Sequence, residues 1–127
     1  METDREEVMR AIIGAFYQVD NALGPGFLEK NYENALAIEL REQGFFVQQQ
    51  APIKVLYKGH CIGEYFVDLL INNCVIVELK ACISIAPQHE AQLLNYLKAT
   101  EIDLGILLNF GPKAEFRRKI YETARKK

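Results

Sequence analysis

The sequence has few of the residues that build disulfide frameworks or zinc sites. It contains three cysteines, Cys61, Cys74 and Cys82, and no two of them form a C-x-x-C pair. This odd number argues against a disulfide framework and a structural zinc site, and it favours reduced thiols in a cytoplasmic protein. The two histidines, His60 and His89, are far apart in the sequence, and no Ser-His-acid arrangement suggests itself.

Long apolar runs are also missing. No stretch approaches the ~20 residues that a helix needs to cross a bilayer, and the charged N-terminus is unlike a secretory signal. The Gly-Pro-Gly segment at 24–26 lacks the Lys-Ser/Thr pair of a phosphate-binding loop, and the end of a helix explains it. We expect a single domain over residues 1–127 with one hydrophobic core.

A strong excess of one charge is absent as well. The formal net charge is −2 and the pI is about 5.7, which counts mildly against a broad basic surface for nucleic acid. Positive charge is nevertheless concentrated near the C-terminus, where it fits either a solvated helix with cations at its C-terminal dipole or a patch that contacts DNA. The residues concerned are Lys113, Arg117, Arg118, Lys119, Arg125, Lys126 and Lys127.

Hydrophobic periodicity and turn residues predict the element order α, α, β, β, β, α, β, α. The first helix ends at Gly24-Pro25-Gly26, and the last follows Gly111-Pro112 and buries Phe116 and Ile120. Between them we expect a helix over 28–43, strands over 45–57, 62–71 and 74–80, a helix over 87–99 and a strand over 104–110.

This order predicts a mixed α/β fold. Three consecutive strands joined by short turns form an antiparallel meander, and a fourth strand that follows a helical crossover must lie roughly parallel to one of them. Pro52 places the first strand at an edge or a bulge. We therefore expect a four-stranded mixed sheet flanked by helices, with an additional N-terminal helix and a C-terminal helix.

Charged residues interrupt two of the apolar strands. Asp68 lies inside the second predicted strand, and Glu78 and Lys80 lie near the end of the third. An ionised carboxylate without a partner is costly to bury, so such residues are usually paired, metal-bound or functional.

Alternation of side chains fixes how these residues meet. A two-residue turn at Asn72-Asn73 would place Asp68 and Glu78 on opposite faces of the sheet. A three-residue turn centred on Asn73 instead pairs Asp68 with Glu78, and it leaves the other face entirely apolar, turned toward the interior. Asparagine also tolerates the left-handed backbone that such a turn needs. We therefore predict the odd-length turn.

That register places two carboxylates about 5 Å apart at their Cβ atoms. Like charges at this distance need a cation between them or a shared proton. Lys80 is one candidate cation, and a divalent ion such as magnesium or manganese is the other. The alternative is a Lys80–Glu78 ion pair on an exposed face, with Asp68 solvated nearby.

The motif Asp68-x9-Glu78-Leu79-Lys80 resembles the D-x(n)-ExK signature of the PD-(D/E)xK nuclease superfamily. The segment Gly26-Phe27-Leu28-Glu29-Lys30-Asn31-Tyr32 also resembles the G-x-x-E-x-x-Y motif of a small family within it. Residues 92–97 and 109–111 are similar to that family too. One departure is Val67, where the superfamily name has proline. The resemblance implies a restriction-endonuclease-like αβββαβ core.

The resemblance also implies a site. Asp68 and Glu78, with the carbonyl of Leu79, would hold Mg²⁺ or Mn²⁺, and Lys80 would position or deprotonate the attacking water. Glu29 would complete the metal shell, unless it is only a first-turn acid that interacts with the helix dipole. Gln92 would be a polar residue of the active site, unless it belongs to an ordinary polar helix face.

The leading hypothesis is a magnesium-dependent nuclease acting on DNA or RNA, with DNA favoured as the partner. One alternative is a nucleic-acid-binding or regulatory module that keeps the fold without turnover. A second is an interaction protein, for example a homodimer, whose charged cluster is a salt-bridge network.

Overall fold

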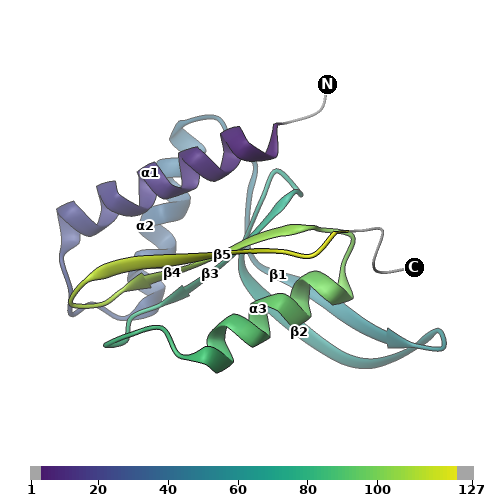
Figure 1. Cartoon of the computed structure of the whole chain (residues 1–127). Coiled ribbons are helices and arrows are strands. Elements are labelled where there is room, and N and C mark those ends of the chain that lie inside the picture. Colours follow the sequence, from purple (N-terminus) through teal and green to yellow (C-terminus); the bar gives the residue numbers. More distant parts are fainter. Residues whose placement is uncertain (1–3, 123–127) are drawn as a thin grey trace.

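The computed structural model describes residues 4–122, and within this range it contains three helices and five strands (Figure 1). The chain order is α, α, β, β, β, α, β, β. The elements are α1 (Arg5–Leu23), α2 (Glu29–Glu42), β1 (Val47–Tyr57), β2 (His60–Ile71), β3 (Val75–Lys80), α3 (Pro87–Ala99), β4 (Leu104–Phe110) and β5 (Ala114–Ile120).

The first helix has a side-chain cap at its N-terminus, and each of the first two helices buries one apolar face. The side chain of Asp4 caps α1 by accepting a hydrogen bond from the backbone N–H of Glu6, and Gly24 ends the helix with a φ of 68°. Tyr32, Leu36 and other residues of one face of α2 are buried. Both helices therefore pack against the sheet through an apolar face.

The sheet has the order β1-β2-β3-β4-β5. The pairs β1–β2, β2–β3 and β4–β5 are antiparallel, whereas β3 and β4 are parallel and joined through α3. Pro52 lies in β1, which is an edge strand, as predicted. The fold is a mixed α/β sheet flanked by helices, with α1 and α2 on one face and α3 on the other (Figure 1).

The predicted C-terminal helix is wrong, because residues 114–120 form β5 and add a fifth strand to the sheet. Phe116 and Ile120 are four residues apart, and this spacing puts two side chains on one face in a helix and in a strand alike. The segment pairs with the wholly buried β4, with Leu108 opposite Phe116. Ile120 was expected to be buried but is 57% exposed.

Apolar side chains form two clusters, one on each face of the sheet. The first joins α1 and α2 to the sheet, and it includes Leu69 and Leu79. The second joins α3 to the sheet, and it includes Val67 and Ile76. The face that carries Asp68 and Glu78 was expected to turn away from the hydrophobic interior; this is wrong, because the second cluster covers part of it.

A kink explains why Val67 and Leu69 belong to different clusters although they alternate on the same side of β2. Gln50, which lies between the pairs Gln49–Leu69 and Ala51–Val67, has a left-handed φ of 52°. Beyond this point the β1–β2 hairpin packs against α3. The kink lies beside Asp68, so it shapes the site.

None of the described helices is long and apolar enough to cross a membrane.

Candidate functional site

Asp68 and Glu78 face each other where the ladder between β2 and β3 ends. The register pairs Ile71 with Val75 and Leu69 with Val77, which confirms the predicted three-residue turn. Both Asn72 and Asn73 adopt positive φ there, at 50° and 55°. The two strands therefore bring the carboxylates to the same place, as the alternation of side chains indicated.

Beyond Leu69 and Val77, side chains bridge the two strands. The backbone N–H of Asp68 donates to Oε2 of Glu78 at 2.7 Å, and the backbone N–H of Leu79 donates to Oδ2 of Asp68 at 2.8 Å. Each carboxylate thus uses one oxygen to hold the opposite strand. Among the described residues, no hydrogen bond reaches Oε1 of Glu78, so that oxygen keeps its lone pairs available.

The surroundings of the pair disfavour its negative charge. Glu78 is only 7% exposed. Burial, together with the charge of Asp68, raises the pKa of Glu78 from 4.5 to about 8. Burial also raises the pKa of Asp68, although the hydrogen bonds from Leu79 and Gln50 oppose this. An added cation would relieve this charge.

Lys80 lies on the same side of β3 as Glu78 and is half-buried. Its charge lowers the pKa of both acids. No ion pair within 4 Å joins it to either carboxylate in the described part of the chain. Because Glu78 is also buried, the alternative of a Lys80–Glu78 ion pair on an exposed face is wrong.

The helix α2 supplies two further acids, at positions 29 and 33. Glu29 is exposed, and its charge contributes to the raised pKa of Glu78, which places it at the rim of the site. Glu33, one turn further along, is 4% exposed. The charge of Glu33 contributes to the raised pKa of Asp68. Both acids therefore act electrostatically on the pair.

Glu33 is held by a network that leads to Asp68. Lys30 donates to it at 2.9 Å and Gln49 at 2.7 Å. The amide nitrogen of Gln50 donates to Glu33 at 2.8 Å and also to Asp68 at 3.2 Å. The kinked residue of β1 thus connects a helical acid to an acid of the pair.

Sequence reasoning missed Glu33 and Gln50. The available signals were the spacing of four residues between Glu29 and Glu33, which places them on one helix face, and the glutamines at 48–50 inside a strand. Neither signal shows that a strand and a helix distant in the sequence meet at Asp68.

The tyrosine of the G-x-x-E-x-x-Y motif is a structural residue in this fold. Tyr32 is fully buried, and its ring stacks on that of Phe110 with centroids 4.3 Å apart. Its hydroxyl donates to the carbonyl of Gly24 at 2.5 Å and accepts from the N–H of Phe27 at 3.2 Å. Tyr32 therefore fixes the loop that leads to Glu29.

The segment 109–111 holds the chain just after Lys80. The buried amide of Asn109 accepts a hydrogen bond from the N–H of Cys82 at 3.0 Å and donates to its carbonyl at 2.9 Å. A Cβ atom at Gly111 would lie 2.2 Å from that carbonyl oxygen. Both residues thus support close approach of the loop that follows β3.

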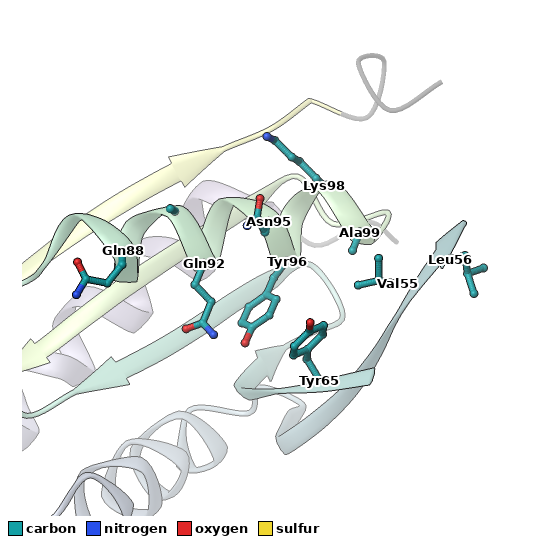
Figure 2. Close-up of a pocket in the computed structure, with 10 residues that line it drawn as sticks. Val55, Leu56, Tyr65, Gln88, Gln92, Asn95, Tyr96, Lys98 and Ala99 are labelled. Atoms are coloured by element: carbon teal, nitrogen blue, oxygen red, sulfur yellow. The ribbon is translucent and has the colours of Figure 1, made fainter. Parts of the chain in front are cut away.

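Gln92 lies on the exposed side of α3 and lines a groove of about 670 Å³ between this helix and the β1–β2 hairpin. Figure 2 shows Gln92 and Tyr96 pointing from α3 toward Tyr65. Burial raises the pKa of Tyr96, and the charges of Glu78 and Asp68 add to the effect. The groove therefore adjoins the acid pair.

Of the four basic residues near the C-terminus that the structure describes, three are paired with acids. Arg117 lies 3.8 Å from Glu115, Arg118 lies 2.6 Å from Glu6, and Lys119 lies 2.9 Å from Glu90. They belong to the edge strand β5, where charged side chains oppose pairing with other chains. Lys113 lies in the turn before β5, and Arg125, Lys126 and Lys127 lie outside the described residues.

Within residues 4–122, no group of three or more His, Cys, Asp or Glu side chains has the arrangement of a metal site. A cation at the acid pair would therefore take its remaining ligands from backbone carbonyls, water or substrate. This is the usual situation for Mg²⁺, which keeps several waters and binds one or two carboxylates together with phosphate oxygens.

Comparisons with known proteins support the resemblance at the level of the superfamily. No curated protein matches the chain significantly. A solved structure described as "Crystal structure of SSO0001" is similar, with a TM-score of 0.48 and 18% identity over 70% of this chain. The match covers 53% of that structure, so this chain spans about half of its length. The sequence profile of the PD-(D/E)XK nuclease superfamily matches residues 6–119, and the chain therefore belongs to this superfamily.

Proposed function

We propose that Asp68, Glu78 and Lys80 form a metal-dependent centre that hydrolyses phosphodiester bonds in nucleic acid. The observation that carries the proposal is the pair of carboxylates that bridges β2 and β3, the buried Glu78 and the half-buried Asp68, with the pKa of Glu78 raised to about 8. Perturbed acids brought together at one place are typical of functional sites.

The donors at this position fit a hard divalent cation. Carboxylate oxygens of Asp68 and Glu78 are the ligands that Mg²⁺ and Mn²⁺ prefer. The N–H and C=O of one residue leave a strand on the same side. Because the N–H of Leu79 points to Asp68, its carbonyl faces the same gap and can add a third oxygen. When bound, the cation would polarise a phosphoryl oxygen and promote formation of hydroxide from water.

The residues of the chain then have separate tasks. Lys80 holds the attacking water and stabilises negative charge that develops on the phosphate. The hydrogen bonds from Asp68 N–H and Leu79 N–H keep the two carboxylates at a fixed separation. The exposed Glu29 can reach the cation through water, and Gln92 contacts the substrate from α3.

We further propose that the chain belongs to the GxxExxY branch of the superfamily and acts on DNA in preference to RNA. The motif residues Gly26, Glu29 and Tyr32 support the first point, since Tyr32 fixes the loop that leads to Glu29.

The experiment is a cleavage assay of the purified protein with Mg²⁺ or Mn²⁺ on single- and double-stranded DNA and RNA. Asp68→Asn and Lys80→Ala should each reduce cleavage by about 10²–10³-fold, in the range found when one group that stabilises the transition state is removed. Glu64→Gln is a matched control, because Glu64 is an exposed acid of the same strand.

Thermal unfolding of each variant shows whether the fold survives. Cleavage that persists in Asp68→Asn, or that needs no divalent ion, contradicts the proposal. Binding without cleavage in the wild type would instead support the catalytically silent module.

A further inference from the structure

We infer that the groove between α3 and the β1–β2 hairpin holds one unpaired nucleobase beside the scissile phosphate, so that the substrate is a single strand or an unpaired end. The inference rests on the proposed function and names the substrate class for that site.

The groove has a polar wall and an apolar wall. Gln88, Gln92 and Asn95 project from α3 on one side, and Val55 and Leu56 of β1 lie on the other (Figure 2). The amides can both donate and accept hydrogen bonds. A volume of about 670 Å³ is large enough for a nucleotide, whose base has polar edges and apolar faces.

An aromatic platform lies between the walls. The ring of Tyr65 is tilted 45° against that of Tyr96, with centroids 5.8 Å apart. Tyr96 is buried, whereas Tyr65 is 46% exposed. Tyr65 therefore has free ring surface, held in place by a second ring. Proteins that bind single strands use such exposed rings to stack bases, because every base has a π-face.

The charge of the groove also fits this ligand. Among its described lining residues there is no acid, and the charged one is Lys98. The backbone of a strand that enters the groove would therefore not meet the repulsion that the acid pair exerts without its cation. A surface without acids, lined by aromatic rings and amides, suits the base, while the phosphate belongs at the acids.

The groove lies close to the proposed reaction centre. Tyr65 precedes Asp68 by three residues on β2, or about 10 Å along the strand. Tyr96 is close enough to the acids for the charges of Glu78 and Asp68 to raise its pKa. A base beside the scissile phosphate could reach Tyr65 only if it leaves its stack. Bases inside a duplex are stacked and paired, and releasing one costs the free energy of both interactions. A single strand or an unpaired end avoids this cost.

Binding experiments can test the platform with a matched pair of variants. Tyr65 and Phe66 are neighbouring aromatic residues of β2 with similar exposure, 46% and 53%, but Phe66 does not line the groove. Both substitutions are made in an Asp68→Asn background to prevent cleavage. Tyr65→Ala should weaken binding of a fluorescein-labelled oligothymidylate by about 5- to 150-fold, the range expected for losing one stacked base. Phe66→Ala should change it less than twofold.

A second measurement detects the contact itself. The chain has no tryptophan, so Tyr65→Trp introduces a single fluorescent indole into the groove, and Phe66→Trp places the same probe outside it. The oligothymidylate should quench the fluorescence of Tyr65→Trp strongly, and that of Phe66→Trp weakly. An abasic oligonucleotide of the same length should not quench Tyr65→Trp.

The outcomes separate this inference from the proposed function. Equal losses for Tyr65→Ala and Phe66→Ala, equal quenching of both tryptophans, or quenching by the abasic strand would overturn the base-binding groove. So would cleavage inside a blunt duplex as fast as cleavage of a single strand. In each case metal-dependent hydrolysis would stand, whereas a wild type that cuts no nucleic acid refutes the proposed function itself.

Discussion

The apolar clusters on the two faces of the sheet differ in size, and the candidate site is connected to both faces. The face covered by α1 and α2 contributes to a cluster of 20 buried hydrophobic residues, whereas the cluster beneath α3 contains eight among the described residues. Glu78 and Asp68 lie beside the smaller cluster, and Gln50 connects Asp68 to Glu33 on the other side. The large cluster can stabilise the fold while the smaller one leaves room for charge and a groove.

The largest expected effect comes from a pair of matched substitutions, one in each apolar cluster. Leu36 and Leu97 are both fully buried, the first in the large cluster and the second in the small one. Leucine-to-alanine changes in cores cost about 2–5 kcal/mol, and the cost falls when neighbours can close the cavity. We expect the loss in the free energy of unfolding to lie near the upper end of this range for Leu36→Ala. For Leu97→Ala it should lie near the lower end, because Leu97 lies on the helix beside the groove.

The measurement is chemical denaturation of both variants and the wild type. Equal losses, or a larger loss for Leu97→Ala, would contradict the idea that the α1/α2 face carries most of the stability.

The next effect depends on pH. The pKa of Glu78 is raised from 4.5 to about 8, so the folded protein holds a proton that the unfolded chain releases above pH 4.5. This contribution to stability is complete below pH 4.5 and is lost as the pH rises to about 8. Without metal, the free energy of unfolding should fall across this window, and Glu78→Gln should flatten the fall.

Glu90→Gln is the control, because the half-buried Glu90 pairs with Lys119 and has a lowered pKa. It should leave the slope between pH 5 and pH 8 unchanged. Manganese should stabilise the wild type increasingly as the pH rises through the same window, and a slope that survives in Glu78→Gln would show that Glu78 is not its source.

The smallest effect concerns the connection between the two faces. Gln50→Asn keeps a residue that tolerates positive φ, but its side chain is too short to bridge Glu33 and Asp68. Manganese affinity, measured by calorimetry, should fall about 10-fold, as is typical when a residue that orients a metal ligand is removed. Lys58→Asn is the control, since Lys58 also has positive φ but lies at the hairpin turn.

If both asparagine variants bind manganese like the wild type, the network through Gln50 does not orient Asp68.

Much of the fold follows from local patterns in the sequence. The alternation around Asp68 and Glu78, with asparagines that tolerate positive φ, was sufficient to predict the register of β2 and β3. Pro87 marked the start of α3. These signals lie within a few residues of the features they predict.

Features that depend on distant contacts could not be predicted in this way. The segment of β5 is a strand because β4 offers an unpaired edge, although the spacing of Phe116 and Ile120 suits a helix equally. Val67 packs in the second cluster, and not in the first, because of the kink at Gln50. The burial of Glu33 depends on donors from β1.

The central claim is that the acid pair binds a divalent cation, and a crystal soaked in Mn²⁺ tests it directly. Anomalous difference density is measured in the gap between β2 and β3. The account predicts a peak within 2.0–2.4 Å, roughly the range for such oxygen ligands, of carboxylate oxygens from both Asp68 and Glu78, and no peak there in Asp68→Asn crystals. Its absence from the wild type at saturating Mn²⁺ would contradict the account.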